Sequence, residues 1–177
     1  MTRNIVVVGP PGAGKTTVAT QLAERLGVEM RDTDADVEAG TGASVADLFV
    51  ERGEEEFRKL EEQAVRTALE ELSGSADGGV VALGGGAILS EETRALLRQS
   101  PVQVVLLEVG LSQAVRRVGL GATRPLLLGN IRSTLKRLLD ERAPLYREVA
   151  DIVVDTDDLT PEQVADRVVE LLTGGAA

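Results

Sequence analysis

Several chemically useful residue types are missing from this chain of 177 residues. It contains no cysteine, no histidine and no tryptophan, and aromatic residues make up only 2% of it. The lack of cysteine excludes disulfide bonds and thiolate metal sites, and the lack of histidine removes the commonest general base and zinc ligand. Any proton transfer must therefore depend on Asp, Glu, Lys, Tyr or water.

Long hydrophobic runs are missing as well. No apolar stretch approaches the roughly 20 residues that a membrane-spanning helix needs, and the run within MTRNIVVVG is too short for a signal peptide. We therefore expect a cytoplasmic protein that does not contact a membrane. Its 43% of hydrophobic and 27% of charged residues are ordinary for a globular protein, and residues 1–177 suffice for one domain with its own core.

Positive charge is scarce overall but concentrated in one region. The formal net charge is −10, which argues against a nucleic acid partner because the phosphate backbone would be repelled. Between residues 111 and 147, however, there are seven arginines and one lysine but only two carboxylates. A guanidinium group binds planar carboxylates and phosphates with two parallel hydrogen bonds, so this region is expected to hold a small anionic ligand.

Apolar runs of strand length alternate with stretches of helical periodicity along the chain. Because parallel strands need crossover helices, this order predicts an α/β fold in which helices cover both faces of a five-stranded parallel sheet. The expected strands are 4–8, 28–31, 80–83, 102–109 and 151–154, and the expected helices are 14–26, 44–51, 54–72, one that opens at Ser90 and one that opens at Thr160.

Residues 119–129 fit neither periodicity. This segment, GLGATRPLLLG, is bounded by glycines and carries Arg124, which is typical of a mobile lid over a reaction site. With the residues that precede it, the expected lid covers about 112–129.

The first expected strand runs into a phosphate-binding motif. Residues 9–16 read GPPGAGKT, which is G-x-x-x-x-G-K-[ST] between a strand and a helix. Gly12 and Gly14 let successive backbone N–H groups point at phosphate oxygens, Lys15 reaches the β- and γ-phosphates, and Thr16 offers a hydroxyl to Mg²⁺. The motif predicts binding of ATP with Mg²⁺. No N-K-x-D stretch for guanine recognition is present, which disfavours a GTPase and leaves a small kinase.

Carboxylates are dense just after the second expected strand. If Asp32 and Asp34 lie on an extended segment, their spacing places both side chains on one side, at the strand ends where ligands gather. One carboxylate could then lie near Mg²⁺ while the other accepts the proton of an attacking hydroxyl. A solvated loop, or an aspartate that caps the next helix, would give the same pattern. Asp36 is expected to be an ordinary solvated carboxylate.

The order and spacing of several motifs together resemble the shikimate kinase family over nearly the whole chain. These motifs are GPPGAGKTT, DTD at 32–34, FRKLE at 57–61, GGGA at 84–87, RPLL at 124–127 and RAPLYRE at 142–148. The resemblance implies a nucleoside monophosphate kinase-like P-loop NTPase fold with a lid and a substrate-binding helical segment at about 33–61. It also implies ATP-dependent phosphorylation of the shikimate 3-hydroxyl, within chorismate and aromatic amino acid biosynthesis, by a monomer.

The resemblance also implies a role for each matching position in acceptor binding. Asp34 is similar to the family's base that contacts the acceptor hydroxyl, and Gly85 to a glycine whose backbone meets the acceptor. Arg58 and Arg142 match the two arginines that hold the acceptor carboxylate. Taken singly, Arg58 could instead pair with a nearby glutamate on its own helix.

On the nucleotide side, Asp32 matches the aspartate that reaches Mg²⁺ through water. Arg124 matches the lid arginine that closes on the transferring phosphate, and Arg117 resembles the residue that lies against adenine. The nucleotide-binding residues of the motif are Gly12, Ala13, Gly14, Lys15, Thr16 and Thr17.

Alternatives to this interpretation remain at the level of sequence. Phe49 and Phe57 could line the acceptor pocket or only pack in the core, and Tyr146 is expected to pack beside Arg142. A kinase for gluconate or a nucleoside monophosphate would share the fold. A non-catalytic nucleotide sensor would bind ATP without turning over an acceptor.

Overall fold

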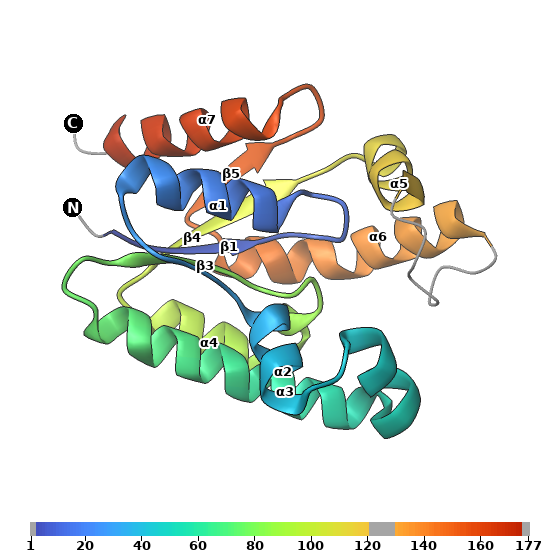
Figure 1. Cartoon of the computed structure of the whole chain (residues 1–177). Helices are drawn as coiled ribbons and strands as arrows, with labels where there is room; N and C mark the ends of the chain where they lie inside the picture. The colour runs from blue at the N-terminus through green and yellow to red at the C-terminus, as the bar shows by residue number, and fades with distance from the viewer. Residues whose placement is uncertain (1–2, 121–129, 175–177) are drawn as a thin grey trace.

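The strands form one parallel sheet, as predicted. The computed structural model describes residues 3–120 and 130–174. Its five strands pair side by side in the order β2-β3-β1-β4-β5, and every pairing is parallel (Figure 1). The strands are β1 Asn4–Val8, β2 Met30–Asp32, β3 Gly79–Ala82, β4 Gln103–Glu108 and β5 Ile152–Asp155. Each expected strand is present, and no strand end is displaced by more than two residues.

Helices cover both faces of this sheet, which confirms the predicted fold class. One face carries α1 Lys15–Leu26 and α7 Pro161–Gly174, and the other carries α3 Val45–Gly74, α4 Glu91–Gln99 and α6 Ile131–Val149 (Figure 1). The remaining helical segments are α2 Thr33–Thr41, η1 Ala87–Leu89 and α5 Leu111–Leu120. No helix within residues 3–120 and 130–174 is long and apolar enough to cross a membrane.

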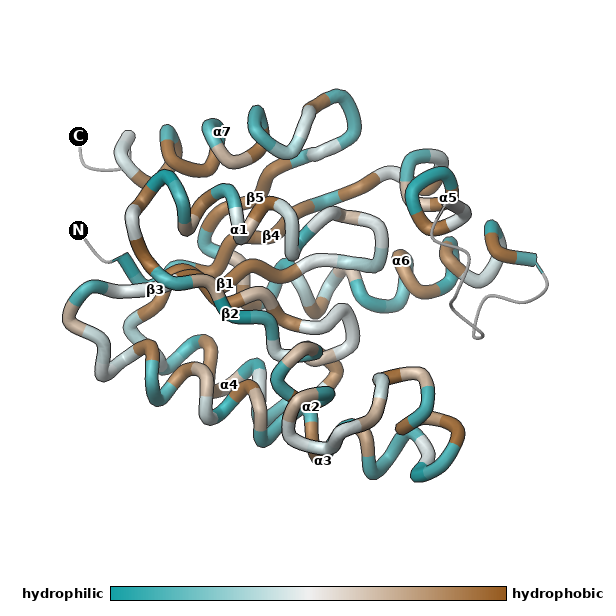
Figure 2. Tube along the Cα trace, viewed as in Figure 1, coloured by the Kyte–Doolittle hydropathy of each residue, from teal (hydrophilic) through white to brown (hydrophobic). Residues whose placement is uncertain are grey.

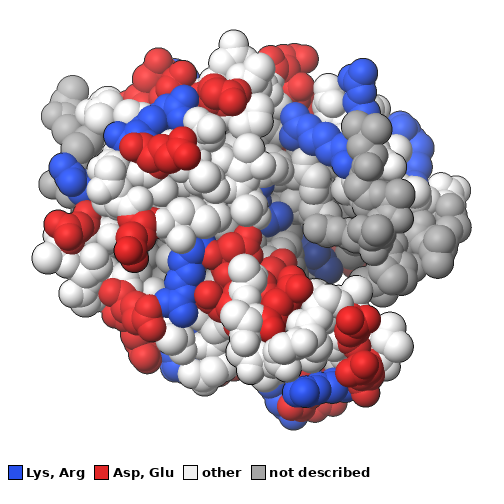
Figure 3. All heavy atoms as spheres, viewed as in Figure 1, with Lys and Arg blue, Asp and Glu red and all other residues white. Residues whose placement is uncertain are grey.

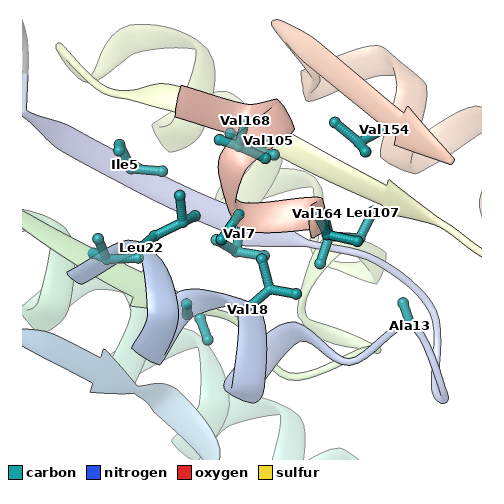
Figure 4. Close-up of a cluster of buried hydrophobic side chains, with 14 of the residues drawn as sticks. Ile5, Val7, Ala13, Val18, Leu22, Val105, Leu107, Val154, Val164 and Val168 are labelled. Carbon is teal, nitrogen blue, oxygen red and sulfur yellow. The ribbon is translucent and has the colours of Figure 1, made fainter. Parts of the chain in front are cut away.

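The alternation of side chains along the strands divides the core between these two layers. Ile5 and Val7 of β1 belong to the cluster that includes α1 and α7, whereas Val6 and Val8 belong to the cluster beneath α3, α4 and α6. Figure 4 shows Val7 and its strand neighbours meeting side chains of α1 and α7. In Figure 2 the central strands are mostly hydrophobic, while the helices carry hydrophilic residues outward. Because all five strands are parallel, their carboxyl ends lie at one edge of the sheet.

Helix α3 contains a break between the two helices expected at 44–51 and 54–72. Gly53 lies between these two stretches and has non-helical angles, φ 80° and ψ 168°. Ser44 caps its start by accepting a hydrogen bond from the Asp47 N–H at 3.1 Å. The buried side of the second half faces the sheet and carries the acidic residue Glu61 among apolar neighbours.

The extended geometry considered for Asp32 and Asp34 is wrong. Strand β2 ends at Asp32, which is the N-cap of α2, and Asp34 lies in the first turn of that helix. An aspartate favours this position because its carboxylate accepts the unpaired N–H groups of the helix start. Arg124 and the rest of the predicted lid beyond Leu120 lie outside the described residues, while the first part of that segment is α5.

Candidate active site

The loop between β1 and α1 has the backbone shape of a phosphate cradle. Gly12 and Gly14 have φ values of 83° and 80°, in the left-handed region that side chains disfavour. A Cβ at Gly12 would also lie 3.3 Å from the Cα of Ala114. Lys15 is the first residue of α1, and its ammonium group donates to the Pro10 carbonyl at 3.0 Å, across the mouth of the loop.

Asp32 performs two tasks at the end of β2. One carboxylate oxygen accepts the N–H groups of Asp34 and Ala35 at 2.9 and 3.2 Å, which caps α2. The other accepts the hydroxyl of Thr16 at 2.7 Å, so the strand end and the cradle meet at this pair. A hydroxyl and a carboxylate beside a phosphate site suit Mg²⁺, which takes few protein oxygens and keeps phosphate and water as ligands. Among the described residues there is no group of three or more acidic side chains that could hold a metal ion.

Arg117 of α5 joins the cradle to the loop after β5. Its guanidinium donates to the Gly12 carbonyl at 3.1 Å, and to the hydroxyl and carbonyl of Thr156 at 3.1 and 3.0 Å. Thr156 is buried and donates in turn to the Glu108 carbonyl at 2.8 Å. These hydrogen bonds hold helix α5 and the loop after β5 beside the nucleotide loop.

Two carboxylates border the first glycine of the GGG segment. A Cβ at Gly84 would lie 2.5 Å from an Asp34 oxygen and 2.7 Å from a Glu61 oxygen. The Gly84 N–H donates to the hydroxyl of Thr33, which is fully buried, at 3.2 Å. The close approach of α2 and α3 to this loop therefore requires a residue without a side chain.

Arg58 lies against the last glycine of the same segment. A Cβ at Gly86 would be 2.6 Å from the guanidinium carbon of Arg58. That guanidinium pairs with Glu61 at 2.8 Å and with Glu54 at 3.4 Å, so the ion pairs considered from sequence do form. It also lies 5.7 and 5.4 Å from the ring centres of Phe49 and Phe57.

Helix α6 completes this cluster from the other side. The hydroxyl of Tyr146 donates a hydrogen bond to the Gly85 carbonyl. Arg142 lies one turn earlier on α6, and its charge acts on both Tyr146 and Glu61. We call Asp34, Arg58, Glu61, Gly84–Gly86, Arg142 and Tyr146 the acceptor cluster.

Burial shifts the titration of two members of this cluster. It raises the pKa of Glu61 above the usual glutamate range, although the guanidinium of Arg58 pulls in the opposite direction. Burial likewise raises the pKa of Tyr146 to about 12, against the lowering influence of Arg142. Tyr146 is therefore a neutral hydrogen-bond donor at neutral pH.

The surface above these residues is hollowed. Figure 3 shows acidic side chains beside a recess at the carboxyl edge of the sheet, with basic atoms deeper in it. A different pocket, of about 310 Å³, lies between β4, β5 and α6. Its lining has a single arginine, Arg147, and does not suit a polyphosphate because four carboxylates also line it: Glu108, Asp140, Asp155 and Asp157.

Three residues of the site were missed by sequence reasoning or given a lesser role. Glu61 was considered only as a partner of Arg58, although it occupies an apolar stripe between Phe57 and Val65, where a charged residue is unusual. Thr33 carried no signal of its contact with Gly84. Tyr146 was expected to pack, and no sequence pattern indicates that its hydroxyl reaches the glycine loop. Asp36, expected in solvent, instead pairs with Arg31 at 2.5 Å.

The parallel sheet, the cradle after β1 and the adjoining acceptor cluster define a P-loop kinase of a small molecule. The sequence model of the family described as Shikimate kinase matches residues 11–173. The chain belongs to the shikimate kinase family, and it is accordingly an ATP-dependent phosphotransferase.

Individual relatives agree with this assignment. The shikimate kinase of Saccharopolyspora erythraea is 54% identical over 173 residues, which cover 97% of this chain and 95% of the relative. That of Salinispora arenicola is 56% identical over 167 residues, 94% of this chain and 96% of the relative. Among solved structures, the shikimate kinase of Acinetobacter baumannii in complex with shikimate has a TM-score of 0.89 at 37% identity, and the match covers 99% of this chain and 96% of that one.

Proposed function

We propose that this protein transfers the γ-phosphoryl group of ATP to the 3-hydroxyl of shikimate, giving shikimate 3-phosphate and ADP. The observation that carries the proposal is the acceptor cluster, in which Asp34, Arg58 and Arg142 gather around the Gly84–Gly86 loop next to the cradle. Such an arrangement suits an acceptor that has both a reacting hydroxyl and a carboxylate. The reaction belongs to the biosynthesis of chorismate and the aromatic amino acids.

On the nucleotide side, the backbone from Gly12 to Thr17 holds the phosphates, and Lys15 contacts the β- and γ-phosphates. Arg117 lies against adenine, at the position where it already joins the cradle to the loop after β5. Arg124 is proposed to approach the transferring phosphoryl group. Thr16 binds Mg²⁺ directly and Asp32 through water, and the ion when bound supplies positive charge to the phosphate oxygens.

On the acceptor side, Asp34 is the base. As the acceptor oxygen forms its bond to the γ-phosphorus, the bond from that phosphorus to the β,γ-bridging oxygen breaks, and the hydroxyl proton passes to the Asp34 carboxylate. This step needs a carboxylate that is held close to the attacking hydroxyl. Asp34 is placed by the α2 cap that Asp32 provides.

The acceptor carboxylate is held by Arg58, Arg142 and the backbone of Gly85. Within the described residues, the N–H groups of Gly85 and Gly86 donate no hydrogen bond to another protein atom, which leaves donors for an anion. Two guanidinium groups and a backbone donor select an acid over a plain sugar. We further propose that the protein is a cytoplasmic monomer and that residues 1–177 form one domain.

The test is a coupled assay of ADP release by the purified protein. We expect release to require shikimate, ATP and Mg²⁺ together, and gluconate or nucleoside monophosphates to replace shikimate poorly. Shikimate methyl ester is the matched control, because it keeps the 3-hydroxyl but lacks the anionic carboxylate. Its KM should be at least about tenfold higher, the worth of a hydrogen bond to a charged group. ADP release that ignores shikimate, or equal KM values for the acid and the ester, would refute the assignment.

A further inference from the structure

Tyr146 is the only tyrosine of the chain, and it is 3% exposed. It belongs to the buried cluster beneath α3, α4 and α6, so its ring has a packing role. Packing does not explain the hydroxyl, which crosses from α6 to the Gly85 carbonyl, 61 residues away in sequence. Phenylalanine would fill the same space without that bond.

The bond restrains one particular peptide group. The Gly85 carbonyl belongs to the peptide that joins Gly85 to Gly86, and no cis peptide occurs in the described chain. In a planar trans peptide the carbonyl and the N–H point in opposite directions. A donor fixed on the carbonyl side therefore turns the Gly86 N–H away from Tyr146. Glycines have the widest choice of backbone angles, so this segment gains more from an external restraint than another would.

The same peptide adjoins groups that act on the acceptor. Gly86, which supplies the N–H of this peptide, lies against the guanidinium of Arg58, and the preceding Gly84 lies against Asp34 and Glu61. Arg142 lies four residues before Tyr146 on α6 and hence on the same side of that helix. Tyr146 thus links α6, which also carries Arg142, to the glycine loop that carries the backbone N–H donors.

We propose that Tyr146 is a positioning residue for the acceptor: its hydroxyl fixes the Gly85–Gly86 peptide and sets the distance between that peptide and Arg142. This inference rests on the proposed function and extends it. The hydroxyl does not touch the reacting atoms. Its effect reaches the acceptor through the backbone of the Gly85–Gly86 peptide and through Arg142 on α6. It does not extend to the nucleotide cradle.

The experiment compares Tyr146→Phe with the wild type in the ADP-release assay, with shikimate and ATP varied separately. The variant keeps the ring and loses both the hydrogen bond to the Gly85 carbonyl and the interaction of the hydroxyl with Arg142, so we expect the KM for shikimate to rise about 5–15-fold. The KM for ATP and kcat should stay within about threefold of the wild type, because an interaction shared by ground and transition states changes KM alone. Titration of shikimate without ATP should show the same loss of affinity.

Ser100→Ala is the matched control. It also removes a hydroxyl that donates to a backbone carbonyl, that of Leu96 at 2.7 Å, but at the end of α4 that leads into the amino end of β4. Both variants should lower Tm by a few degrees, and only Tyr146→Phe should change the KM for shikimate. Assays run at a temperature where circular dichroism shows all three proteins folded.

The outcomes separate the two claims. If the wild type shows no shikimate-dependent ADP release, the proposed function fails. If the wild type turns over shikimate and Tyr146→Phe has an unchanged KM for it, the hydroxyl only stabilises the fold and this inference fails. An equal rise of both KM values would also overturn it, because the effect would then not be confined to the acceptor.

Discussion

The nucleotide half and the acceptor half of the site are built in different ways. The cradle comes from consecutive residues between β1 and α1, and its ligand-binding groups are mostly backbone N–H groups held by a helix start. The acceptor cluster draws its side chains from α2, α3, α6 and the glycine loop after β3. The nucleotide half is a local backbone shape above an apolar core. The acceptor half is a set of side chains whose opposite charges offset one another.

This difference has a consequence for how each half fails. A backbone cradle is damaged by changes that alter its φ and ψ angles, whereas the acceptor cluster is damaged by changes that displace one charge from its neighbours. Both halves use glycine, but for different reasons. Gly12 supplies a backbone angle, and Gly86 leaves room for a guanidinium group.

The largest effect is expected where the two halves meet, at Asp34. Asp34→Asn removes the base without changing its size, so kcat should fall about 10²–10⁴-fold while ATP affinity is retained. Steady-state kinetics and ATP titration measure this. Turnover close to that of the wild type would remove Asp34 from the role of base and make the acceptor half a binding device only.

Gly86→Ala tests the acceptor half alone. The new Cβ would occupy the place of the Arg58 guanidinium, so the KM for shikimate should rise about 10–100-fold, the cost of disturbing a hydrogen-bonded charge. The KM for ATP should not change. Gly74→Ala, at the exposed end of α3 with open space around it, is the control and should leave both KM values alone. A rise in the KM for ATP instead would contradict the separation of the halves.

Gly12→Ala is the reciprocal test. A left-handed φ of 83° in a residue with a side chain, together with the contact at Ala114, strains the cradle. Strain of this kind costs about 1–3 kcal/mol, so ATP affinity should fall about 5–150-fold. Shikimate affinity measured without nucleotide should match the wild type. If shikimate affinity falls equally, the two halves are one cooperative unit and the contrast is wrong.

The smallest effect concerns Glu61 and pH. Its pKa is raised in the folded protein, chiefly by burial, above the ordinary value of 4.5. At pH values between the ordinary pKa and the raised pKa of the folded protein, the folded state binds more protons than the unfolded state. This group therefore makes the free energy of unfolding fall as pH rises, by at most about 1.4 kcal/mol per pH unit. The free energy of unfolding of the wild type, minus that of Glu61→Gln, should therefore fall as pH rises through this range.

Denaturant titrations from acidic to neutral pH give that difference directly. Glu55→Gln is the control, because Glu55 is an exposed carboxylate on the same helix that pairs only loosely with Lys59 at 3.4 Å. Its profile should parallel that of the wild type. A Glu61→Gln profile that also runs parallel would mean that burial of the charge is fully offset by Arg58.

The strands and the cradle were predictable, with every strand end within two residues, whereas helices α5 and α6 were not among the expected helices. The apolar runs that became β1, β3 and β4 are buried on both faces, and such runs form parallel strands whatever lies far away. The start of α2 was not predicted, because Asp32 reads equally as part of an extended segment and as a helix cap. In the structure Asp32 is both the last residue that pairs with β3 and the cap of α2.

The sequence by itself determined the parallel sheet, the phosphate cradle and, through resemblance, the residues that meet the acceptor, because these depend on neighbouring residues or on motifs in a fixed order. Tertiary structure alone decided that the charges of Asp34 and Arg142 act on Glu61, that Gly86 adjoins Arg58 and that Tyr146 reaches Gly85. These contacts join residues from separate elements, and their distances depend on how whole helices pack on the sheet. No local pattern encodes such distances.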